Sequence, residues 1–369
     1  MKMSEISVLI PVYKESKLLE KMLQKLLLQK ISKEIFVIID EPTEKSIEIS
    51  KKFGGEVNFI LNKKRVGKAG ALNKAVKISS GKILLFLDDD IELPDKPDFL
   101  KTIKKEMEDA DILDIKKEVI RTSFLSKMTY YEYVGFNIGS WLVARFIGKS
   151  PAVNGAAFAM RRDVFDSIKG FRKVVSEDLD IATRSFLKGY RFKYTKNVEV
   201  YNHVHSSWKK WIKQRRRWVT GAALWFKEWY KPLLKESVRR PQIFIPALIF
   251  VFPSLIIFLT AFLLPDLLIY KLFSILLLFL IIKFNIVLPF LLFTSLGIII
   301  FKSLLFSLIG FLLFTVLFFV LSNRLNFRVK FHEFFVYYFF YSLVSLFFMI
   351  AGLIKVFIFN KKSVPDWKI

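Results

Sequence analysis

Cysteine is absent from this chain of 369 residues, and histidine occurs only three times. A chain without cysteine has neither a disulfide framework nor thiolates for catalysis or metal binding. The sequence also contains no internal repeat, no low-complexity linker and no recognisable signal peptide. We therefore expect the first half of the chain to stay in the cytosol.

Acidic residues are scarce as well, since 33 Asp and Glu stand against 58 Lys and Arg, a formal net charge of +25. Such a charge favours nucleic acid, an anionic membrane surface or a phosphorylated substrate as the partner. Residues 241–369 hold only ten Lys or Arg and three Asp or Glu. The distribution predicts a charged domain followed by a membrane domain, which favours the membrane surface and the phosphorylated substrate over nucleic acid.

Apolar runs alternate with helix-like stretches over the first 90 residues. The expected strands are 7–11, 34–40, 57–61 and 82–87, and the expected helices are 16–30, 43–53 and 67–79. Repeats of this length predict parallel strands with right-handed crossovers, and so an α/β doubly wound sheet. Ligands bind such sheets beyond the carboxyl ends of the strands, where Asp40 and Asp88 lie.

The pattern after residue 110 is mixed. We expect strands at 112–120 and 191–195, and helices at 124–147 and 178–188. We divide the chain into a catalytic domain at 1–205, an amphipathic region at 206–240 and a transmembrane domain at 241–369.

The amphipathic region combines basic residues with tryptophans. The tryptophans are Trp208, Trp211, Trp218, Trp225 and Trp229. Mixed with Lys and Arg, this composition suits a helix in the lipid headgroup layer. The alternative is a helix whose tryptophans are buried in the protein core.

Three later segments are long enough to cross a bilayer, which takes roughly 20 apolar residues. They are Ile243–Leu264, Ser303–Leu321 and Phe334–Phe359. A fourth segment, Leu267–Phe301, is interrupted by Lys283 and Pro289 and forms either one kinked span or two short ones. We expect about four spans.

The run Asp88-Asp89-Asp90 follows a predicted strand directly. Three adjacent carboxylates repel one another unless a cation is present. In an extended segment Asp88 and Asp90 point the same way and Asp89 points the other way. Carboxylate oxygens suit Mg²⁺ or Mn²⁺, which commonly also bind substrate phosphates. The simpler alternative is a solvated acidic turn.

Two further motifs lie at predicted helix starts. Gly67–Asn73 includes Lys68, and backbone N–H groups at a helix N-terminus together with a lysine favour an anion such as a diphosphate. Glu177 and Asp178 follow Ser176, which suits a helix cap. The functional alternative makes Asp178 a general base toward an acceptor hydroxyl.

The fourth motif is Gln214-Arg215-Arg216-Arg217-Trp218. On a helix, Gln214, Arg217 and Trp218 share one face because they are three and four residues apart. Arginine binds phosphate, and a tryptophan ring stacks on a sugar or base. The alternative is a basic helix on anionic lipid.

In this order the four motifs resemble those of the family 2 glycosyltransferases with a GT-A nucleotide-sugar fold, over residues 5–235. The chain is most similar to the membrane-bound branch with cellulose, chitin and hyaluronan synthases and ceramide glucosyltransferase. The resemblance implies catalytic roles for Glu177 and Asp178 and an acceptor pocket at Gly155 and Trp218. It implies metal binding by Asp88 and Asp90. It implies nucleotide-sugar binding by Pro11, Tyr13, Asp40, Glu41, Lys68, Asp88, Asp89, Gln214, Arg217 and Trp218.

The chain departs from the family pattern at Asp40-Glu41-Pro42-Thr43, where an acidic pair is usually followed by Gly-Ser. These residues are expected to hold the base, and Asp89 is expected to touch the ribose or only support the fold.

The resemblance implies an inverting transfer of a sugar from a nucleotide-diphosphate sugar, with UDP as the expected nucleotide. Mg²⁺ or Mn²⁺ is the expected cofactor, and a lipid or lipid-linked glycan the expected acceptor. The enzyme would be an integral protein of the cell membrane with a cytoplasmic catalytic domain. One alternative is a processive polysaccharide synthase that extrudes its product between the helices. Another is a non-enzymatic basic protein that binds anionic lipid. The sequence does not predict the oligomeric state.

Overall fold

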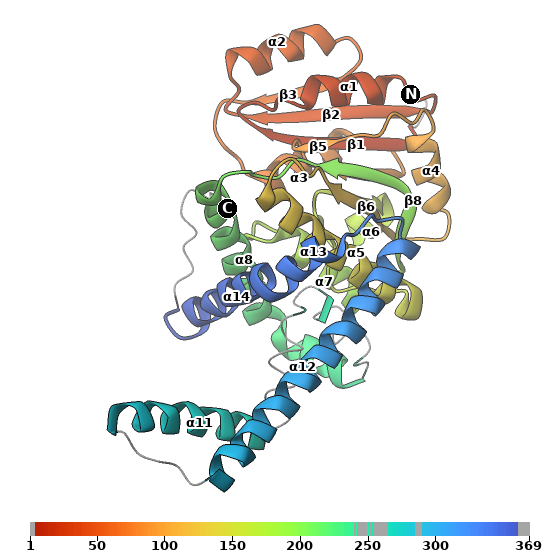
Figure 1. Ribbon diagram of the computed structural model, residues 1–369. Coiled ribbons are helices and arrows are strands. Elements are labelled where there is room, and N and C mark those ends of the chain that lie inside the picture. Colours follow the sequence, from red (N-terminus) through yellow and green to blue (C-terminus); the bar gives the residue numbers. More distant parts are fainter. Residues whose placement is uncertain are drawn as a thin grey trace. The chain divides into compact units, whose positions relative to one another are not determined.

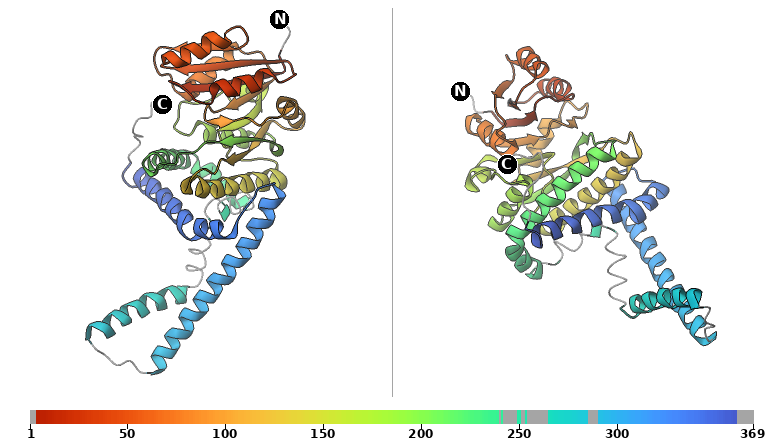
Figure 2. Two further views of the ribbon diagram at one scale, coloured as in Figure 1. Left: turned by 45° about the horizontal axis from the view of Figure 1, so that its top comes forward. Right: turned by 90° about the vertical axis from the view of Figure 1, so that its left-hand side faces the viewer.

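The computed structural model describes residues 4–239, 241, 249–250, 253, 265–284 and 290–360. By internal contacts the chain forms two units, one of Met1–Ala247 with Phe347–Ile369 and the other of Leu248–Leu346. Figures 1 and 2 show the elements from several directions. The sheet and all the predicted site residues belong to the first unit.

An eight-stranded sheet forms the centre of the first unit. Its strands are β1 (Ile6–Tyr13), β2 (Lys33–Asp40), β3 (Asn58–Asn62), β4 (Ile83–Leu87), β5 (Ile91–Glu92), β6 (Ile112–Val119), β7 (Ala157–Arg161) and β8 (Phe192–Asn202). They lie in the order β3-β2-β1-β4-β7-β6-β8-β5. β1 pairs in parallel with β2 and β4, and β2 pairs in parallel with β3. The four parallel strands predicted for the first 90 residues are thus confirmed.

The other half of the sheet is mixed. β7 pairs antiparallel with both β4 and β6, while β6 and β8 are parallel. We did not predict β7, and parallel pairing was expected only for the strands of the first 90 residues. β8 continues to Asn202, well beyond the predicted end at residue 195.

Eight helices belong to the same unit among the described residues up to 239. They are α1 (Leu19–Leu27), α2 (Glu44–Phe53), α3 (Lys68–Ile78), α4 (Phe99–Glu106), α5 (Phe124–Ile147), α6 (Arg162–Ser167), α7 (Glu177–Lys188) and α8 (Trp208–Arg239). α5 has the predicted bounds because its ends carry strong signals. Ser123 forms a capping box with Ser126, and Gly148 ends the helix with φ 67°.

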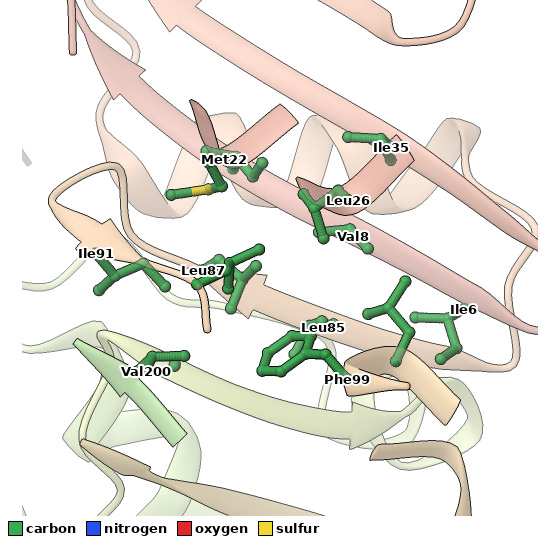
Figure 3. Close-up of a cluster of buried hydrophobic side chains, with 14 of the residues drawn as sticks. Ile6, Val8, Met22, Leu26, Ile35, Leu85, Leu87, Ile91, Phe99 and Val200 are labelled. Carbon is green, nitrogen blue, oxygen red and sulfur yellow. The ribbon is translucent and has the colours of Figure 1, made fainter. Parts of the chain in front are cut away.

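Both faces of the sheet are covered, because successive side chains of each buried strand point to opposite sides. On one face Val8 and Leu85 pack with Met22 of α1 and Phe99 of α4 in the cluster drawn in Figure 3. The neighbouring strand residues face the other way and pack against α3, α6 and α7. Those strand residues are Leu9, Phe36, Leu84 and Phe86.

α8 packs against the catalytic part of the chain. The Trp225 indole N–H donates to Thr183 of α7 at 2.8 Å. Trp211 is 1% exposed. We placed Trp211 and the basic residue Arg215 in a lipid headgroup layer, and the structure instead buries both in protein. For these two residues the alternative of a buried helix is the right one.

The apolar C-terminal segment forms long helices. They are α11 (Pro265–Phe284), α12 (Phe290–Arg324), α13 (Phe331–Val336), the π-helical turn η2 (Tyr337–Tyr341) and α14 (Ser342–Phe357). In the described part of the chain one helix, Phe331–Phe357, is long and apolar enough to cross a membrane, and Ile275–Phe284 and Leu308–Arg324 are shorter apolar helices. The predicted span Ile243–Leu264 and the interruption at Pro289 fall almost wholly outside the described residues.

Candidate active site

The predicted site residues gather at the edge of the sheet where the parallel strands end. β1 ends at Tyr13 and β2 at Asp40, which are opposite each other in the register. β4 ends at Leu87, so Asp88 follows at the same edge. Parallel α/β sheets bind ligands beyond this edge, which makes it the place to look for chemistry.

Lys68, the first residue of α3, joins three segments of the chain. Its Nζ lies 2.6 Å from Asp88 Oδ1 and 3.4 Å from Glu177 Oε1, and it donates to the Gly155 carbonyl at 3.5 Å. Burial opposes the charge of this amine, but the carboxylates of Asp88, Glu177 and Asp178 outweigh burial and raise the pKa of Lys68. Lys68 is therefore a fixed cation between the end of β4 and the start of α7.

Asp178 is held beside this lysine by backbone donors. The N–H of Gly155 donates to Asp178 Oδ2 at 3.1 Å, and the N–H of Leu179 donates to Oδ1 at 2.8 Å. Burial raises the pKa of Asp178, and Lys68 opposes that shift. Burial also raises the pKa of Glu177 to about 7, against the effect of Lys68 and with that of Asp178. Two carboxyl groups with raised pKa values thus lie side by side.

Residue 155 must be glycine for this contact. A Cβ on Gly155 would lie 2.8 Å from Asp178 Oδ2 and 2.9 Å from Asp178 Cβ. Such distances do not occur between real side-chain atoms, so any side chain would push the Asp178 carboxylate away. Gly155 therefore fixes the place of Asp178 from the strand side.

The acidic run after β4 carries crowded charge. The N–H of Asp88 donates to the carbonyl of Ala156 at 2.9 Å, which fixes the start of the run. Burial, then Asp90 and Asp88, raise the pKa of Asp89 to about 8. The Asp90 side chain is exposed, yet the protein atoms around it and Asp88 raise its pKa to about 6. Both shifts follow from the closeness of the three carboxylates and the protein atoms around them, and Lys68 only partly offsets them.

The donor set fits a divalent metal that arrives with its substrate. In the described ranges no three His, Asp or Glu side chains are arranged to hold a metal by themselves. Asp88, which pairs with Lys68, and the exposed Asp90 supply carboxylate oxygens two residues apart. Mg²⁺, and Mn²⁺ with similar ligand preferences, commonly takes one or two carboxylates and completes its shell with phosphate oxygens and water.

α8 brings a further cation toward the acidic run. The pKa of Asp90, raised by the protein atoms around it and by Asp88, is held down in part by the positive charges of Lys68 and Arg217. Arg217 therefore lies within electrostatic reach of the centre. Gln214 is half-buried on the same helix.

A buried ion pair that the sequence did not reveal fixes α8. The guanidinium of Arg215 donates to both carboxylate oxygens of Glu132 on α5, one at 2.6 Å. Arg215 is 5% exposed and Glu132 is 2% exposed. The guanidinium also lies 4.7 Å from the Trp218 ring centroid. Because the two partners are 83 residues apart, no local pattern in the sequence pointed to the pair.

The end of β2 organises the loop before α3. Asp40 is buried, and its Oδ1 accepts from the Asn62 amide at 2.9 Å. Its Oδ2 accepts from the N–H groups of Val66 and Gly67, each at 2.9 Å. Both oxygens of Asp40 therefore bind protein groups and shape the turn that leads to Lys68.

Tyr13 and Glu41 lie next to this turn. The Tyr13 hydroxyl donates to Glu41 Oε2 at 3.1 Å, and the Arg65 guanidinium lies 4.3 Å from the Tyr13 ring centroid. Pro11 is half-buried two residues earlier in β1. These residues lie over β1 and β2, apart from the charged centre at the end of β4.

The N-terminal part of the chain is similar to known glycosyltransferases. Residues 7–169 match the model of "Glycosyl transferase family 2". The chain is 29% identical over 225 residues to a probable glucomannan 4-beta-mannosyltransferase of Oryza sativa, covering 57% of this chain and 38% of the relative. It is 26% identical over 238 residues to the probable glycosyltransferase YdaM of Bacillus subtilis, covering 59% and 55%. The chain thus spans about half or less of the length of these relatives.

The fold also has a solved counterpart. A mannosyltransferase from Pyrobaculum calidifontis, determined in complex with GDP-Man and Mn²⁺, superposes with a TM-score of 0.51 at 20% identity. The match covers 63% of this chain and 65% of that chain. The likeness supports a GT-A-like α/β domain.

Proposed function

We propose that the protein transfers a sugar from a nucleotide-diphosphate sugar to an acceptor hydroxyl. Residues 7–169 match the family 2 glycosyltransferase model and the domain has a GT-A-like fold, which support this proposal. The observation that carries this proposal is Lys68, held between Asp88 and Glu177 beside the carboxylate of Asp178. A cation and a base at one strand edge suit a leaving diphosphate and an attacking hydroxyl.

Asp178 is the proposed general base of an inverting reaction. It takes the proton of the acceptor hydroxyl while the hydroxyl oxygen forms a bond to the anomeric carbon. The bond from that carbon to the diphosphate oxygen breaks, and the nucleoside diphosphate leaves from the opposite face. Glu177 holds Lys68 in place, and Lys68 and Arg217 stabilise the charge of the leaving group.

Asp88 and Asp90 would hold a divalent metal, Mn²⁺ or Mg²⁺, which neutralises the diphosphate when it is bound. The raised pKa values of Asp89 and Asp90, caused in part by the neighbouring carboxylates, support this proposal. Asp89 would contact the ribose or support the loop, whose Asp89 carbonyl accepts from Ser16 at 2.6 Å.

The other contacts with nucleotide, sugar and acceptor that the resemblance implies are also proposals. Pro11, Tyr13, Asp40 and Glu41 would form the nucleotide end of the site. Three residues would meet the sugar or acceptor: Gly155, Gln214 and Trp218.

The identities of the transferred sugar and of the acceptor have weaker support. The relatives' names favour mannose as the transferred sugar. The apolar C-terminal helices favour an acceptor at the membrane, a lipid or lipid-linked glycan, with the catalytic domain on the cytoplasmic side. A non-enzymatic role in binding anionic lipid is disfavoured, because four acidic residues at the centre would repel such a ligand. These residues are Asp88, Asp90, Glu177 and Asp178.

Polysaccharide synthesis is the second candidate. The names of the Oryza relatives and the Gln-X-X-Arg-Trp motif at 214–218 favour it. Membranes incubated with labelled donor distinguish the two, because a glycolipid is extracted into organic solvent whereas a polymer stays behind at high mass.

A donor screen tests the proposed activity. The purified full chain is incubated with a panel of nucleotide sugars, with Mn²⁺ or with a chelator, and release of nucleoside diphosphate is measured. We expect metal-dependent release from at least one donor. No release from any donor, with crude membrane extract supplied as acceptor, would contradict the proposal.

A further inference from the structure

One face of α8 carries Arg217 and continues along α7, and the inference drawn from this contact rests on the proposed function. Residues three and four apart share a face of a helix, and on α8 they are Arg217, Gly221, Trp225 and Glu228. The Trp225 indole N–H donates to Thr183 of α7 at 2.8 Å. Glu228 lies 2.7 Å from Arg172, whose guanidinium also lies 2.9 Å from Asp180 of α7. This face of α8 is therefore attached to α7.

Gly221 is the point where this face meets the start of α7. It is buried, and a Cβ there would lie 2.3 Å from Ser176 Oγ, 3.0 Å from Val175 Cγ1 and 3.6 Å from Ser176 Cβ. Ser176 directly precedes Glu177, the first residue of α7, and its side chain makes no capping hydrogen bond. It packs against Gly221 instead, two residues before Asp178. α8 comes this close to the start of α7 because residue 221 has no side chain.

α8 is held from two other directions. Val219 points roughly 200° away from Gly221 around the helix. On that side a Cβ on Gly352 of α14 would lie 2.9 Å from both the Cβ and the carbonyl oxygen of Val219, so α14 packs closely on α8. Toward α5, the guanidinium of Arg215 donates to both carboxylate oxygens of Glu132. α8 therefore has little room to move away from α7.

The segment before α7 is the more yielding partner in this contact. Residues 171–176 form neither helix nor strand. A larger side chain in place of Gly221 would therefore displace Ser176 and the first turn of α7 rather than α8. That turn contains Asp178, whose carboxylate Gly155 binds from the strand side.

We propose that Gly221 is a positioning residue for the reaction, because its missing side chain sets the place of the Asp178 carboxylate relative to Arg217. Asp178 would take the acceptor proton, and Arg217 would meet the leaving diphosphate. Both groups act in one transition state, and a displacement near 1 Å of such a group costs about 100-fold in rate. α8 thus fixes the base and the leaving-group cation relative to each other.

The test introduces Gly221→Val into the full chain in detergent with Mn²⁺. It measures kcat and the dissociation constant for the nucleotide sugar with the highest turnover in the donor screen. A valine side chain is stiff in a helix, so it cannot turn away from Ser176. We expect kcat per donor-binding site to fall about 100-fold. The donor dissociation constant should stay within about threefold of wild type, because Arg217 keeps its place.

A second substitution separates positioning from damage to the fold. Expressing kcat per donor-binding site makes a misfolded fraction cancel. Ser176→Gly in the Gly221→Val chain removes the Oγ and Cβ that the valine meets, and kcat should recover at least about tenfold. Gly310→Val in α12, where an added Cβ has nothing within 4 Å, is the matched control and should keep wild-type kcat.

Three results would overturn the proposal: wild-type kcat in Gly221→Val, a loss of donor affinity as large as the loss of kcat, or no recovery with Ser176→Gly. The glycosyltransferase proposal survives each of them. If the wild type turns over no donor, the proposed function itself fails, and this inference with it.

Discussion

Lys68 lies among the carboxylates of Asp88, Glu177 and Asp178, and the negative charge of all three raises its pKa. Glu177 and Asp178 have raised pKa values because they are buried, and Lys68 reduces both shifts. The same lysine would meet the diphosphate of the donor. At the scale of single residues, burial and the charge of Lys68 therefore set the pKa values of Glu177 and Asp178, and that of Glu177 lies at about 7.

This tuning predicts the pH dependence of the reaction. Asp178 must be ionised to accept a proton, and burial raises its pKa, so the rate must fall as the pH falls. Glu177, with a pKa of about 7, loses its hold on Lys68 in the same direction. We expect kcat/KM of the wild type to fall as the pH falls below the raised pKa of Asp178, by up to about tenfold per pH unit.

The variant Glu177→Gln checks this assignment. It removes a neighbouring negative charge, and the acid limb of the profile should move to lower pH. A wild-type profile that stays flat from about pH 5 to 8 would contradict the role given to Asp178.

The sequence predicted the centre but not the partners of its members. Lys68 was predicted because it begins a helix, and Asp88 because it follows an apolar strand. Asp178 was predicted because it lies in the first turn of a helix after the cap residue Ser176. Asp40 was expected to hold the base, and the structure adds that its carboxylate accepts from the backbone N–H groups of Val66 and Gly67. Such hydrogen bonds join residues far apart in the chain, so composition and spacing do not reveal them.

At the scale of elements, the contact between β7 and α7 depends on Gly155. We expect Gly155→Ala to lower kcat about 100-fold, because a displacement near 1 Å of a catalytic group costs that much. Gly55→Ala, where an added Cβ would have nothing within 4 Å, is the control and should keep wild-type activity. Steady-state turnover with saturating donor measures both, and equal activity of the two variants would show that Asp178 needs no glycine beside it.

The buried pair of Glu132 and Arg215 fixes α8 to α5. Arg215→Met removes the guanidinium that binds both oxygens of the buried Glu132 carboxylate, and we expect a loss of about 3–5 kcal/mol in the free energy of unfolding. The double variant Glu132→Leu with Arg215→Met should recover most of that loss. Denaturant unfolding in detergent measures the difference.

The exposed pair of Arg161 and Asp163 is the control for this experiment. Asp163→Asn should change the free energy of unfolding by about 1 kcal/mol or less. If Arg215→Met were as mild, the buried pair would not hold α8.

β7 shows why the sheet was only partly predicted. It has five residues, Ala157–Arg161, directly after the loop that contains Gly155, and it pairs with strands about 45 and 70 residues earlier. A strand this short has too few residues for a clear period. β1 to β4 were predicted because long apolar runs and intervening helices mark them.

At the scale of the whole molecule, the apolar helices of the second unit predict whether the protein lies in a membrane. α12 exposes large apolar side chains along its described length. They include Phe301, Leu305, Phe306, Leu312, Leu313 and Val316. A water-soluble protein rarely exposes so continuous an apolar surface, so we predict that the protein is embedded in lipid.

Alkaline carbonate extraction of membranes from expressing cells measures this. The full chain should stay in the pellet, whereas a protein bound only by charge is released. Recovery of the chain in the supernatant would contradict the membrane assignment. The number of spans stays a prediction, because residues 254–264 and 285–289 are outside the described ranges.

The central claim is that Asp178 performs the chemistry of sugar transfer while other groups bind the donor. The most direct measurement compares kcat and donor affinity for the wild type and Asp178→Asn, with the exposed Asp166→Asn as control. We predict that Asp178→Asn lowers kcat about 1000-fold and leaves the dissociation constant of the donor within about threefold, because the proton transfer is needed only in the reaction. Wild-type kcat in Asp178→Asn would contradict the account.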